Sequence, residues 1–559
     1  MVTGQHGPLA VCADRDQTAS REMLAEFFKV SEMLSVRYRV VCGLAALSAV
    51  FVGCADEEAT SLPFGDADPG FTGMSDGSAA DGPPAPDIID AADAGAVPDV
   101  ASGFSFFVGP LGLDSNPGTL AAPLLTVSSA AAKAKAGDTI WLLDGTYNQA
   151  NQATGTLTTC DRMPAVGIAS GVTVRPMNPG MVLVKPQDWG VFCLHGATVR
   201  DLDFEGPPAG GVLLNVKDGD NVVEGATFSN GVCGGGSGWE GAIMVRGAAT
   251  LTMVPGRAQN FMGNAGCTFM TTWDTSRVTF KGGSVIGGRS TGTSGNGLFI
   301  ARDASGLTFE GTTISSSQHE YGVALTHMST LTIKAGSTLY GFTGAAILAR
   351  AENHVVTITD STIRNNGSGL SLPRGFGGTV TATITGGVFS ANGYAIYQGL
   401  GHTLNLTAVR SRFINSSVSG LELTSSVVDI RDSEISANAM NGLFLQPQSV
   451  CSVTMRNTKI MGNGMRGLFF YCDATGTANL GTLASPGGNT FSGNALNVVS
   501  GRPLMPIDAI GNTWTPSQQG ANAEGQYVAS GVGAVLEITG GNGPNYELGA
   551  VKMRVAANP

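Results

Sequence analysis

Titratable and cationic side chains recur at one position of a motif that is repeated along the chain. Counting five residues past the glycine, or its equivalent, that opens each copy gives His195, Arg246, Arg302, His327, Arg350, Arg374 and Gln398. Arginine presents a planar fork of donors that binds carboxylates in bidentate fashion, and histidine titrates near neutral pH. If consecutive copies stack, the residues from Arg302 to Arg374 form a column suited to an anionic chain.

Two interpretations of this column remain open. In the first, it is a groove for an acidic polysaccharide such as a uronic-acid polymer, with His327 as the candidate base if there is catalysis. In the second, the charges form local structural pairs with carboxylates nearby in sequence. The first interpretation assigns binding to Arg302, His327, Arg350, Arg374, Gln398 and Tyr397. Aromatic residues that could stack on sugars are Trp239, Tyr321, Tyr397 and Tyr471.

A weaker candidate site consists of three carboxylates. Asp201, Asp203 and Glu205 alternate in sequence, so in a strand they share one face. Carboxylate oxygens are suitable ligands for Ca²⁺, so Ca²⁺ is the candidate cofactor at this site. Our expectation for the protein is nevertheless that it has no cofactor. The alternative is a solvated strand surface carrying no metal.

Six cysteines follow Cys54 in the sequence. Export past the inner membrane permits disulfides, and six cysteines allow 15 connectivities. Pairing between nearest neighbours favours Cys160–Cys193, Cys233–Cys267 and Cys451–Cys472. No CxxC pair or histidine cluster is present, which argues against zinc.

The repeated motif predicts the fold. A glycine followed by alternating apolar residues recurs at Gly297, Gly322, Gly369, Gly420, Gly442 and Gly467, and a second series recurs at Leu307, Leu331, Val356, Leu404, Val428 and Val453. Both series advance by about 22–26 residues, a solenoid period, and a third short apolar segment follows each second strand. The alternation predicts that Leu298, Ile300, Leu370 and Leu372 point inward. Asparagines at 366, 392, 415, 438 and 463 predict a stacked amide ladder.

The region before the repeat adds a resemblance. Phe107-Val108, Gly112 to Thr119, Gly137 to Ile140 and Gly145 to Tyr147 resemble the domain of unknown function that begins many bacterial pectin-lyase-like β-helix proteins. The resemblance implies an all-β, right-handed parallel β-helix with three strands per coil. A helix from about residue 126 to 136, ended at Gly137, is expected to cap its open end.

Enzymes on that fold act on acidic polysaccharides, but their signatures are not evident in this chain. A polygalacturonase resemblance would need Gly-His-Gly, and only Gly401-His402 is present. We therefore expect a glycan-binding protein, and we retain a diverged polysaccharide lyase or hydrolase and a structural envelope protein as alternatives.

The N-terminal region predicts where in the cell the protein is located. Arg37 and Arg39 precede an apolar run that ends at Gly53-Cys54, which resembles the lipobox of bacterial lipoproteins. We therefore expect Cys54 to be lipidated. With Ala55 after it, we expect an outer-membrane lipoprotein that is periplasmic or surface-exposed.

The predicted organisation has five parts. Residues 1–32 are a mis-assigned start, 33–54 the lipoprotein signal peptide, 55–102 a disordered acidic linker, 103–500 the β-helix with its cap at 103–147, and 501–559 a closing segment. The net charge is −12 and no basic run is present, which excludes nucleic acid as an expected partner. The expected partners are the membrane, through the lipid, and an acidic polysaccharide, bound by a monomer.

Overall fold

The computed structural model describes residues 103–514 with gaps, and also 534–538 and 551–555. The gaps are 149–157, 161–162, 186–191, 207–211, 231, 234–240, 255–256, 264–267, 291–296, 318, 351, 447–450, 473–475, 483, 501–506 and 510. Residues 1–102, with the predicted signal peptide, Cys54 and linker, lie outside the described residues. Among the described residues, no helix is long and apolar enough to cross a membrane.

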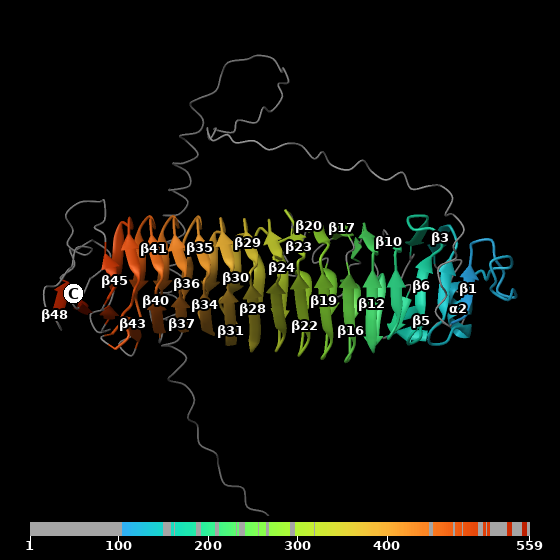
Figure 1. Ribbon diagram of the computed structural model, residues 1–559, viewed down its shortest axis with the longest axis horizontal. Coiled ribbons are helices and arrows are strands. Elements are labelled where there is room, and N and C mark those ends of the chain that lie inside the picture. Colours follow the sequence, from blue (N-terminus) through green and yellow to red (C-terminus); the bar gives the residue numbers. More distant parts are fainter. Residues whose placement is uncertain are drawn as a thin grey trace, which may run out of the picture. The chain divides into compact units, whose positions relative to one another are not determined.

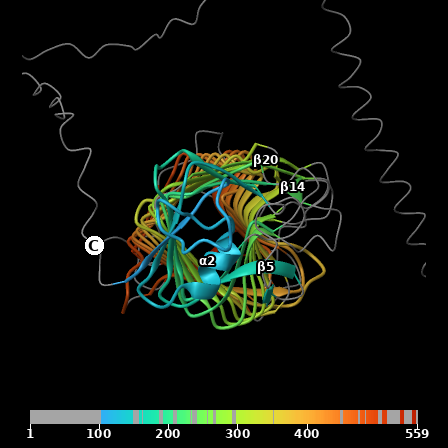
Figure 2. The same ribbon diagram turned by 90° about the vertical axis from the view of Figure 1, so that its right-hand side faces the viewer.

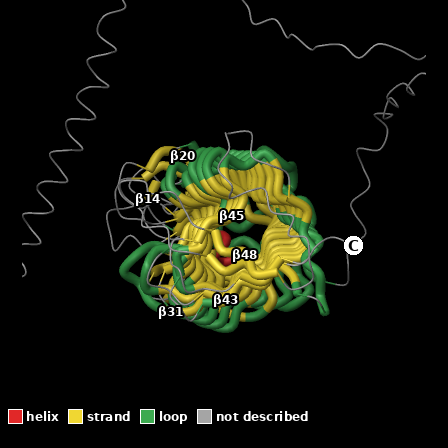
Figure 3. Tube along the Cα trace, turned by 90° about the vertical axis from the view of Figure 1, so that its left-hand side faces the viewer, coloured by secondary structure: helices red, strands yellow, loops and turns green. Residues whose placement is uncertain are grey.

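Successive coils stack into a solenoid whose sides are three parallel sheets (Figure 1). Each regular coil contributes one strand to each sheet. Figure 3 shows the sheets surrounding the interior when the solenoid is viewed along its axis. This confirms the prediction of a parallel β-helix with three strands per coil. Parallel strands buried on their inner face explain the alternating apolar residues of each element.

Sheet 1 contains the strands of the first repeated series and has 15 strands among the described residues. In chain order these are β4 (Thr158–Cys160), β5 (Met163–Ile168), β8 (Phe192–His195), β11 (Leu214–Asp218), β15 (Gly241–Val245), β18 (Thr268–Thr272), β21 (Gly297–Ala301), β24 (Tyr321–Thr326), β27 (Ala345–Arg350), β30 (Ser368–Leu372), β33 (Tyr394–Gln398), β36 (Leu421–Leu423), β39 (Asn441–Leu445), β42 (Arg466–Phe470) and β45 (Leu496–Ser500). Apart from the antiparallel pair β4–β5, neighbouring strands run parallel.

Sheet 2 contains the second series, with 18 described strands. They are β1 (Ser105–Val108), β2 (Thr139–Leu142), β6 (Thr173–Pro176), β9 (Thr198–Arg200), β12 (Asp220–Glu224), β16 (Thr250–Val254), β19 (Arg277–Lys281), β22 (Gly306–Glu310), β25 (Thr330–Lys334), β28 (His354–Thr359), β31 (Gly378–Thr385), β34 (His402–Val409), β37 (Ser426–Arg431), β40 (Cys451–Arg456), β43 (Thr477–Gly481), β46 (Ile507–Ala509), β48 (Ala534–Ile538) and β49 (Val551–Val555). At its C-terminal end β49 pairs in parallel with β46 and antiparallel with β48.

Sheet 3 contains the third series, with 16 described strands. They are β3 (Gly145–Asn148), β7 (Val182–Lys185), β10 (Asp203–Glu205), β13 (Thr227–Ser229), β14 (Val232–Cys233), β17 (Arg257–Gly263), β20 (Ser284–Ser290), β23 (Thr313–Ser315), β26 (Thr338–Tyr340), β29 (Thr362–Arg364), β32 (Val388–Ser390), β35 (Arg412–Ile414), β38 (Glu434–Ser436), β41 (Lys459–Met461), β44 (Thr490–Ser492) and β47 (Thr513–Trp514). The coils therefore continue past residue 500, where the sequence analysis placed the start of the closing segment.

A short helix, α2 (Val127–Lys133), packs against β1, β2 and β5 near the N-terminal end of the coils (Figure 2). Thr126 caps it by accepting a hydrogen bond from the Ser129 amide. Asp114, from the segment that carries the family resemblance, accepts hydrogen bonds from the amides of Leu125 and Thr126. Burial raises the pKa of Asp114, but the hydrogen bonds from Thr126 and its neighbours outweigh it and hold the pKa below its usual value.

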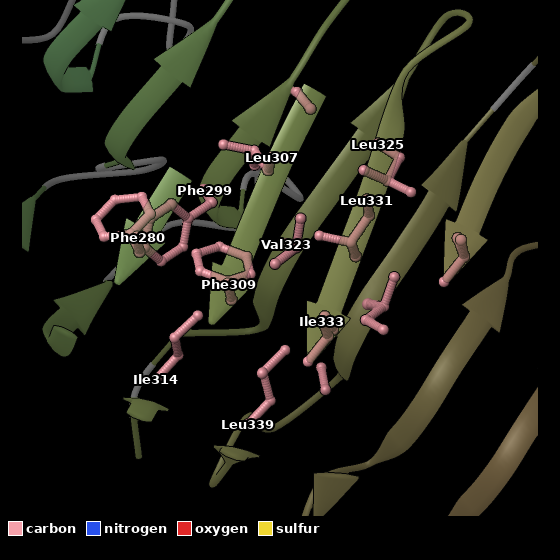
Figure 4. Close-up of a cluster of buried hydrophobic side chains, with 14 of the residues drawn as sticks. Phe280, Phe299, Leu307, Phe309, Ile314, Val323, Leu325, Leu331, Ile333 and Leu339 are labelled. Atoms are coloured by element: carbon pink, nitrogen blue, oxygen red, sulfur yellow. The ribbon is translucent and has the colours of Figure 1, made fainter. Parts of the chain in front are cut away.

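The interior is a continuous column of apolar side chains from all three sheets (Figure 4). The predicted inward residues Leu298, Leu370 and Leu372 belong to this core and are fully buried. The prediction for Ile300 is wrong, because Phe299 and Ala301 pack in the main core while Ile300 lies in a separate outer cluster with Ala324 and Leu348. The outer face of sheet 1 is therefore itself apolar and buried at these coils.

The predicted amide ladder forms inside the turns before sheet 1. The side chain of Asn366 donates to Asn392 at 3.0 Å, and that of Asn438 donates to Asn463 at 2.9 Å. Asn415 is not a member, because it is exposed in a left-handed turn conformation. Ser416 takes the ladder position instead, and its amide donates to Asn438.

Candidate functional site

The register of sheet 1 separates the residues that the glycine count had aligned. Ala301 pairs with Leu325, which places Arg302 level with Thr326 rather than with His327. Thr326 in turn pairs with Arg350. The glycines that open successive copies are not equivalent, since Gly297 pairs with Tyr321 and not with Gly322. The predicted single column is therefore wrong in register.

What the register does align is a set of residues at the end of the sheet 1 strands, which we call the cation–aromatic row: Arg246, Trp273, Arg302, Thr326 and Arg350. Val245 pairs with Thr272, and Thr272 with Ala301, so the residues that follow them are level in three successive coils. The guanidinium carbons of Arg246 and Arg302 lie 4.9 and 3.9 Å from the centre of the Trp273 ring. Two cations therefore flank one indole, in contacts worth about 0.5–2 kcal/mol each.

The Asp303 carboxylate partly offsets the repulsion between the Arg246 and Arg302 guanidinium groups. Burial lowers the pKa of the Arg302 guanidinium; the Asp303 carboxylate acts in the opposite direction and the Arg246 charge adds to the lowering.

The sequence analysis missed Trp273, because its coil lacks the opening glycine from which the count began. Counting back from the second strand series would have found it.

Arg350 ends the row beside a second aromatic residue. Its guanidinium carbon lies 5.7 Å from the centre of the Tyr321 ring, and the Tyr321 hydroxyl donates to Glu320 at 2.6 Å. Burial raises the pKa of Tyr321 to about 12, and the hydrogen bond with Glu320 adds to the rise. Glu320, a carboxylate nearby in sequence, is thus paired with a tyrosine.

His327 lies one residue past the row, in the turn that follows sheet 1. Asp274, Asp303 and His327 all adopt left-handed conformations there. The Asp274 amide donates to Asp303, and the His327 Nδ1 atom lies 3.8 Å from the Asp303 carboxylate. The imidazole is about half exposed, so it is accessible to a ligand that lies along the row.

The remaining predicted binding residues are not in the row. Gln398 pairs with Leu372 and is 0% exposed. Its amide donates to the carbonyls of His402 and Ser425 and accepts from the Ser426 hydroxyl at 2.6 Å. Its assignment to binding is therefore wrong, because the side chain is fully buried and a ligand on the surface could not reach it. Arg374 is exposed in the turn after β30.

His195 is also apart from the row. Its Nδ1 atom lies 3.0 Å from the Asp218 carboxylate, and its Nε2 atom lies 3.3 Å from the Cys193 sulfur. The register pairs His195 with Asp218, so this contact joins neighbouring coils.

Tyr397 belongs to a second feature, on the outer face of the C-terminal half of sheet 1. Tyr397 pairs with Glu422, Glu422 with Phe444, and Phe444 with Phe469. We call these four residues the aromatic–carboxylate strip. Sequence reasoning included only Tyr397 from it, although alternation within the later copies of the motif would have placed the other three on the same face.

The three predicted metal ligands are held by separate partners. Asp201 lies in a turn 3.7 Å from Arg175, Asp203 accepts a hydrogen bond from Thr227, and Glu205 pairs with Lys185 at 2.9 Å. Asp203 and Glu205 lie on β10 of sheet 3. Within the described ranges no group of three metal-ligating side chains occurs.

Two of the three predicted disulfides are present. Cys160 is bonded to Cys193, and Cys451 to Cys472. Cys267, a member of the third predicted pair, lies outside the described residues.

One family model and several solved structures are similar to this chain. The sequence matches no curated protein. Similar solved structures include the A-module of the Azotobacter vinelandii mannuronan C-5 epimerase AlgE6, with 14% identity, a TM-score of 0.31, and coverage of 70% of this chain and 93% of that chain. Alginate lyase AlyF-OU02 has 12% identity and a TM-score of 0.33, over 67% of this chain and 82% of that chain.

A third similar structure is the catalytic unit of a GH87 α-1,3-glucanase from Streptomyces thermodiastaticus strain HF3-3. It has 12% identity and a TM-score of 0.37, over 70% of this chain and 65% of that chain. At these identities the likeness concerns the fold alone. One family model, described as a right handed beta helix region, matches residues 296–496 of the sequence.

Proposed function

We propose that this protein is a lipid-anchored extracytoplasmic β-helix that binds an acidic polysaccharide at the cation–aromatic row. The observation that carries the proposal is the placement of Trp273 between the guanidinium groups of Arg246 and Arg302. A guanidinium stacked on a ring keeps its in-plane donors directed outward, in the geometry that suits a carboxylate. Arg350, two coils beyond Arg302, extends the row along the solenoid axis, so an elongated ligand parallel to that axis could contact both arginines.

Calorimetric titration with an oligogalacturonate tests this proposal. Replacing Arg302 and Arg350 together by Gln should weaken binding about tenfold or more, since two charge-assisted contacts are lost. Lys at both positions should restore only part of the affinity, because it keeps the charge but not the fork. Added salt should weaken the unaltered protein in the same direction.

The matched control removes two other surface arginines. Arg412 and Arg431 lie on sheets 3 and 2, each about half exposed. Replacing both by Gln changes the net charge equally and should leave oligogalacturonate binding unchanged. Absence of binding by the unaltered protein, or equal losses in the two double variants, would contradict the proposal.

Catalysis is the second candidate, and the contact between His327 and Asp303 favours it. A half-exposed imidazole near a carboxylate, one residue from the row, is placed to act as a general base on a bound uronic acid. A diverged lyase would then give unsaturated products from oligogalacturonate, detected by ultraviolet absorbance, and His327→Gln would abolish them. A purely structural envelope protein would bind no glycan and release no product.

The proposal gives a role to three N-terminal features of the chain. Cys54, in its lipobox-like sequence, would carry the lipid, and residues 55–102 would tether the coils to the outer membrane. Helix α2 would cover the first coil, shielding apolar interior and unpaired strand edges from solvent.

A further inference from the structure

The aromatic–carboxylate strip differs in charge and composition from the cation–aromatic row. Along it a tyrosine, a glutamate and two phenylalanines occupy four successive coils, about 4.8 Å apart. Tyr394 lies beside the strip with its ring centre 5.1 Å from that of Tyr397. The rings of Phe444 and Phe469 are stacked at 4.8 Å. The strip is therefore a row of rings with one carboxylate between them, partly exposed at Tyr397, Glu422 and Phe444 and buried at Phe469.

Glu422 is the feature that the fold does not account for. Its carboxylate accepts one hydrogen bond, from the Gln446 amide at 2.8 Å. Among the described residues no Lys, Arg or His forms an ion pair with it. Burial raises its pKa above the usual value, and the Gln446 bond only partly opposes this. A half-buried negative charge without a cation is a cost to stability that a cationic ligand would relieve.

The neighbours of Glu422 favour the same kind of ligand. Tyr397 and Phe444 lie one coil before and one coil after it. Aromatic faces attract ammonium groups through their quadrupole, most strongly where water is excluded. The protein already uses this contact at the far end of the strip, where the guanidinium of Arg466 lies 4.3 Å from the Phe469 ring centre.

We propose that the strip binds an amino-sugar oligosaccharide, with an ammonium group of the sugar at the Glu422 carboxylate between Tyr397 and Phe444. The ligand is a chain because the partly exposed Tyr397, Glu422 and Phe444 follow one another over three coils in the direction of the solenoid axis. A sugar chain fits better than a peptide because pyranose rings offer flat C–H faces to the tyrosine and phenylalanine rings. The site goes beyond the acidic-glycan function proposed above and does not depend on it.

The test uses two oligosaccharides that differ only in N-acetylation, which removes the ammonium charge and adds an acetyl group at each sugar. The full chain is titrated with the tetramer of β-1,4-linked glucosamine and with the tetramer of N-acetylglucosamine. We expect the glucosamine tetramer to bind and the acetylated tetramer to bind about tenfold more weakly, because it has lost the ammonium groups. Equal binding of both tetramers, or no binding of the first, overturns the proposal.

Variants then locate the site. Glu422→Gln keeps the shape of the side chain and one oxygen that can accept from Gln446, but removes the charge, and should weaken glucosamine-tetramer binding about tenfold. Glu434→Gln, on sheet 3 beside Arg412, makes the same change in net charge and should have no effect. Equal losses in the two variants would mean that only net charge matters, and this overturns the site. The melting temperature of each variant reports its folding.

Two further arms separate the alternatives. In the first, tetralysine competes with the glucosamine tetramer for binding at Glu422. Equally strong binding of tetralysine would indicate a cationic peptide partner and would contradict the proposal. The Arg302→Gln, Arg350→Gln double variant should bind the glucosamine tetramer as the unaltered protein does. If the row does not bind oligogalacturonate, the strip can therefore still bind the glucosamine tetramer. If the strip does not bind the glucosamine tetramer, the row can still bind oligogalacturonate.

Discussion

The guanidinium carbon of Arg302 lies 3.9 Å from the centre of the Trp273 ring, one coil away along sheet 1. Arg246 lies on the same ring from the preceding coil. The ring thus fixes the orientation of two cations that would otherwise be long, flexible side chains. Their ordering is completed before a ligand arrives, which reduces the entropy that binding must overcome.

The role of the indole is testable without altering either arginine. Trp273→Ala should weaken oligogalacturonate binding several-fold, because both guanidinium groups lose the ring that orients them. Trp273→Phe keeps a smaller ring face and should retain part of the affinity. Calorimetric titration measures both. If the alanine variant binds as tightly as the unaltered protein, the stack is not part of the site.

The alternation in sheet 1 is testable at two adjacent residues. Leu372 is fully buried in the core, while Ser371 is partly exposed on the outer face. Leu372→Asp should lower the free energy of unfolding by about 3 kcal/mol or more, since it buries an unpaired charge. Ser371→Asp should lower it by about 1 kcal/mol or less. Chemical denaturation measures the two, and equal effects would contradict the assignment of faces.

Glu422 should reduce stability at neutral pH. Its pKa is raised from 4.5, chiefly by burial, so the folded protein favours the protonated carboxyl. The associated stability is fully present below pH 4.5 and is lost as the pH rises through the raised pKa. Glu422→Gln, which stays neutral, should therefore melt at a higher temperature than the unaltered protein at pH 7 and at a similar temperature near pH 4. Identical melting at pH 7 would show that the carboxylate is not destabilised by burial.

His402 should have the opposite pH dependence. Burial lowers its pKa below 6.5, and the nearby His354 adds to the lowering, although the contact with the Pro373 carbonyl acts against it. Stability that is present above pH 6.5 is then lost as the pH falls through the lowered pKa, because the unfolded chain binds the proton more readily. The free energy of unfolding between pH 7 and pH 5 should fall less steeply in His402→Gln. Parallel pH profiles would rule out this contribution.

Lipid anchoring is testable in cells. A fatty-acid analogue should label the unaltered protein, and Cys54→Ala should abolish the labelling because the thiol that would carry the lipid is gone. Cys451→Ala provides a control that removes a different cysteine. Labelling of the Cys54 variant, or of neither protein, would contradict the anchor.

The sequence by itself determined the class of fold. Apolar alternation at a period of about 22–26 residues leaves little choice but short stacked strands, because each copy can bury its inner face only against the next. The same pattern placed Leu372 in the core and Asn366 in the amide ladder, since both depend on local periodicity. The nearest-neighbour disulfide Cys451–Cys472 followed from the spacing of one coil.

Only the tertiary structure decided the candidate sites. A shift of one residue moves a side chain from one face of a strand to the other or into a turn, and the register is fixed by pairing between coils. That shift placed His327 in the turn and put Gln398 in the interior, and the stacking of the coils set Trp273 beside Arg302. Glycines marked the copies but not their alignment, because in successive coils they occupy different positions of the strand.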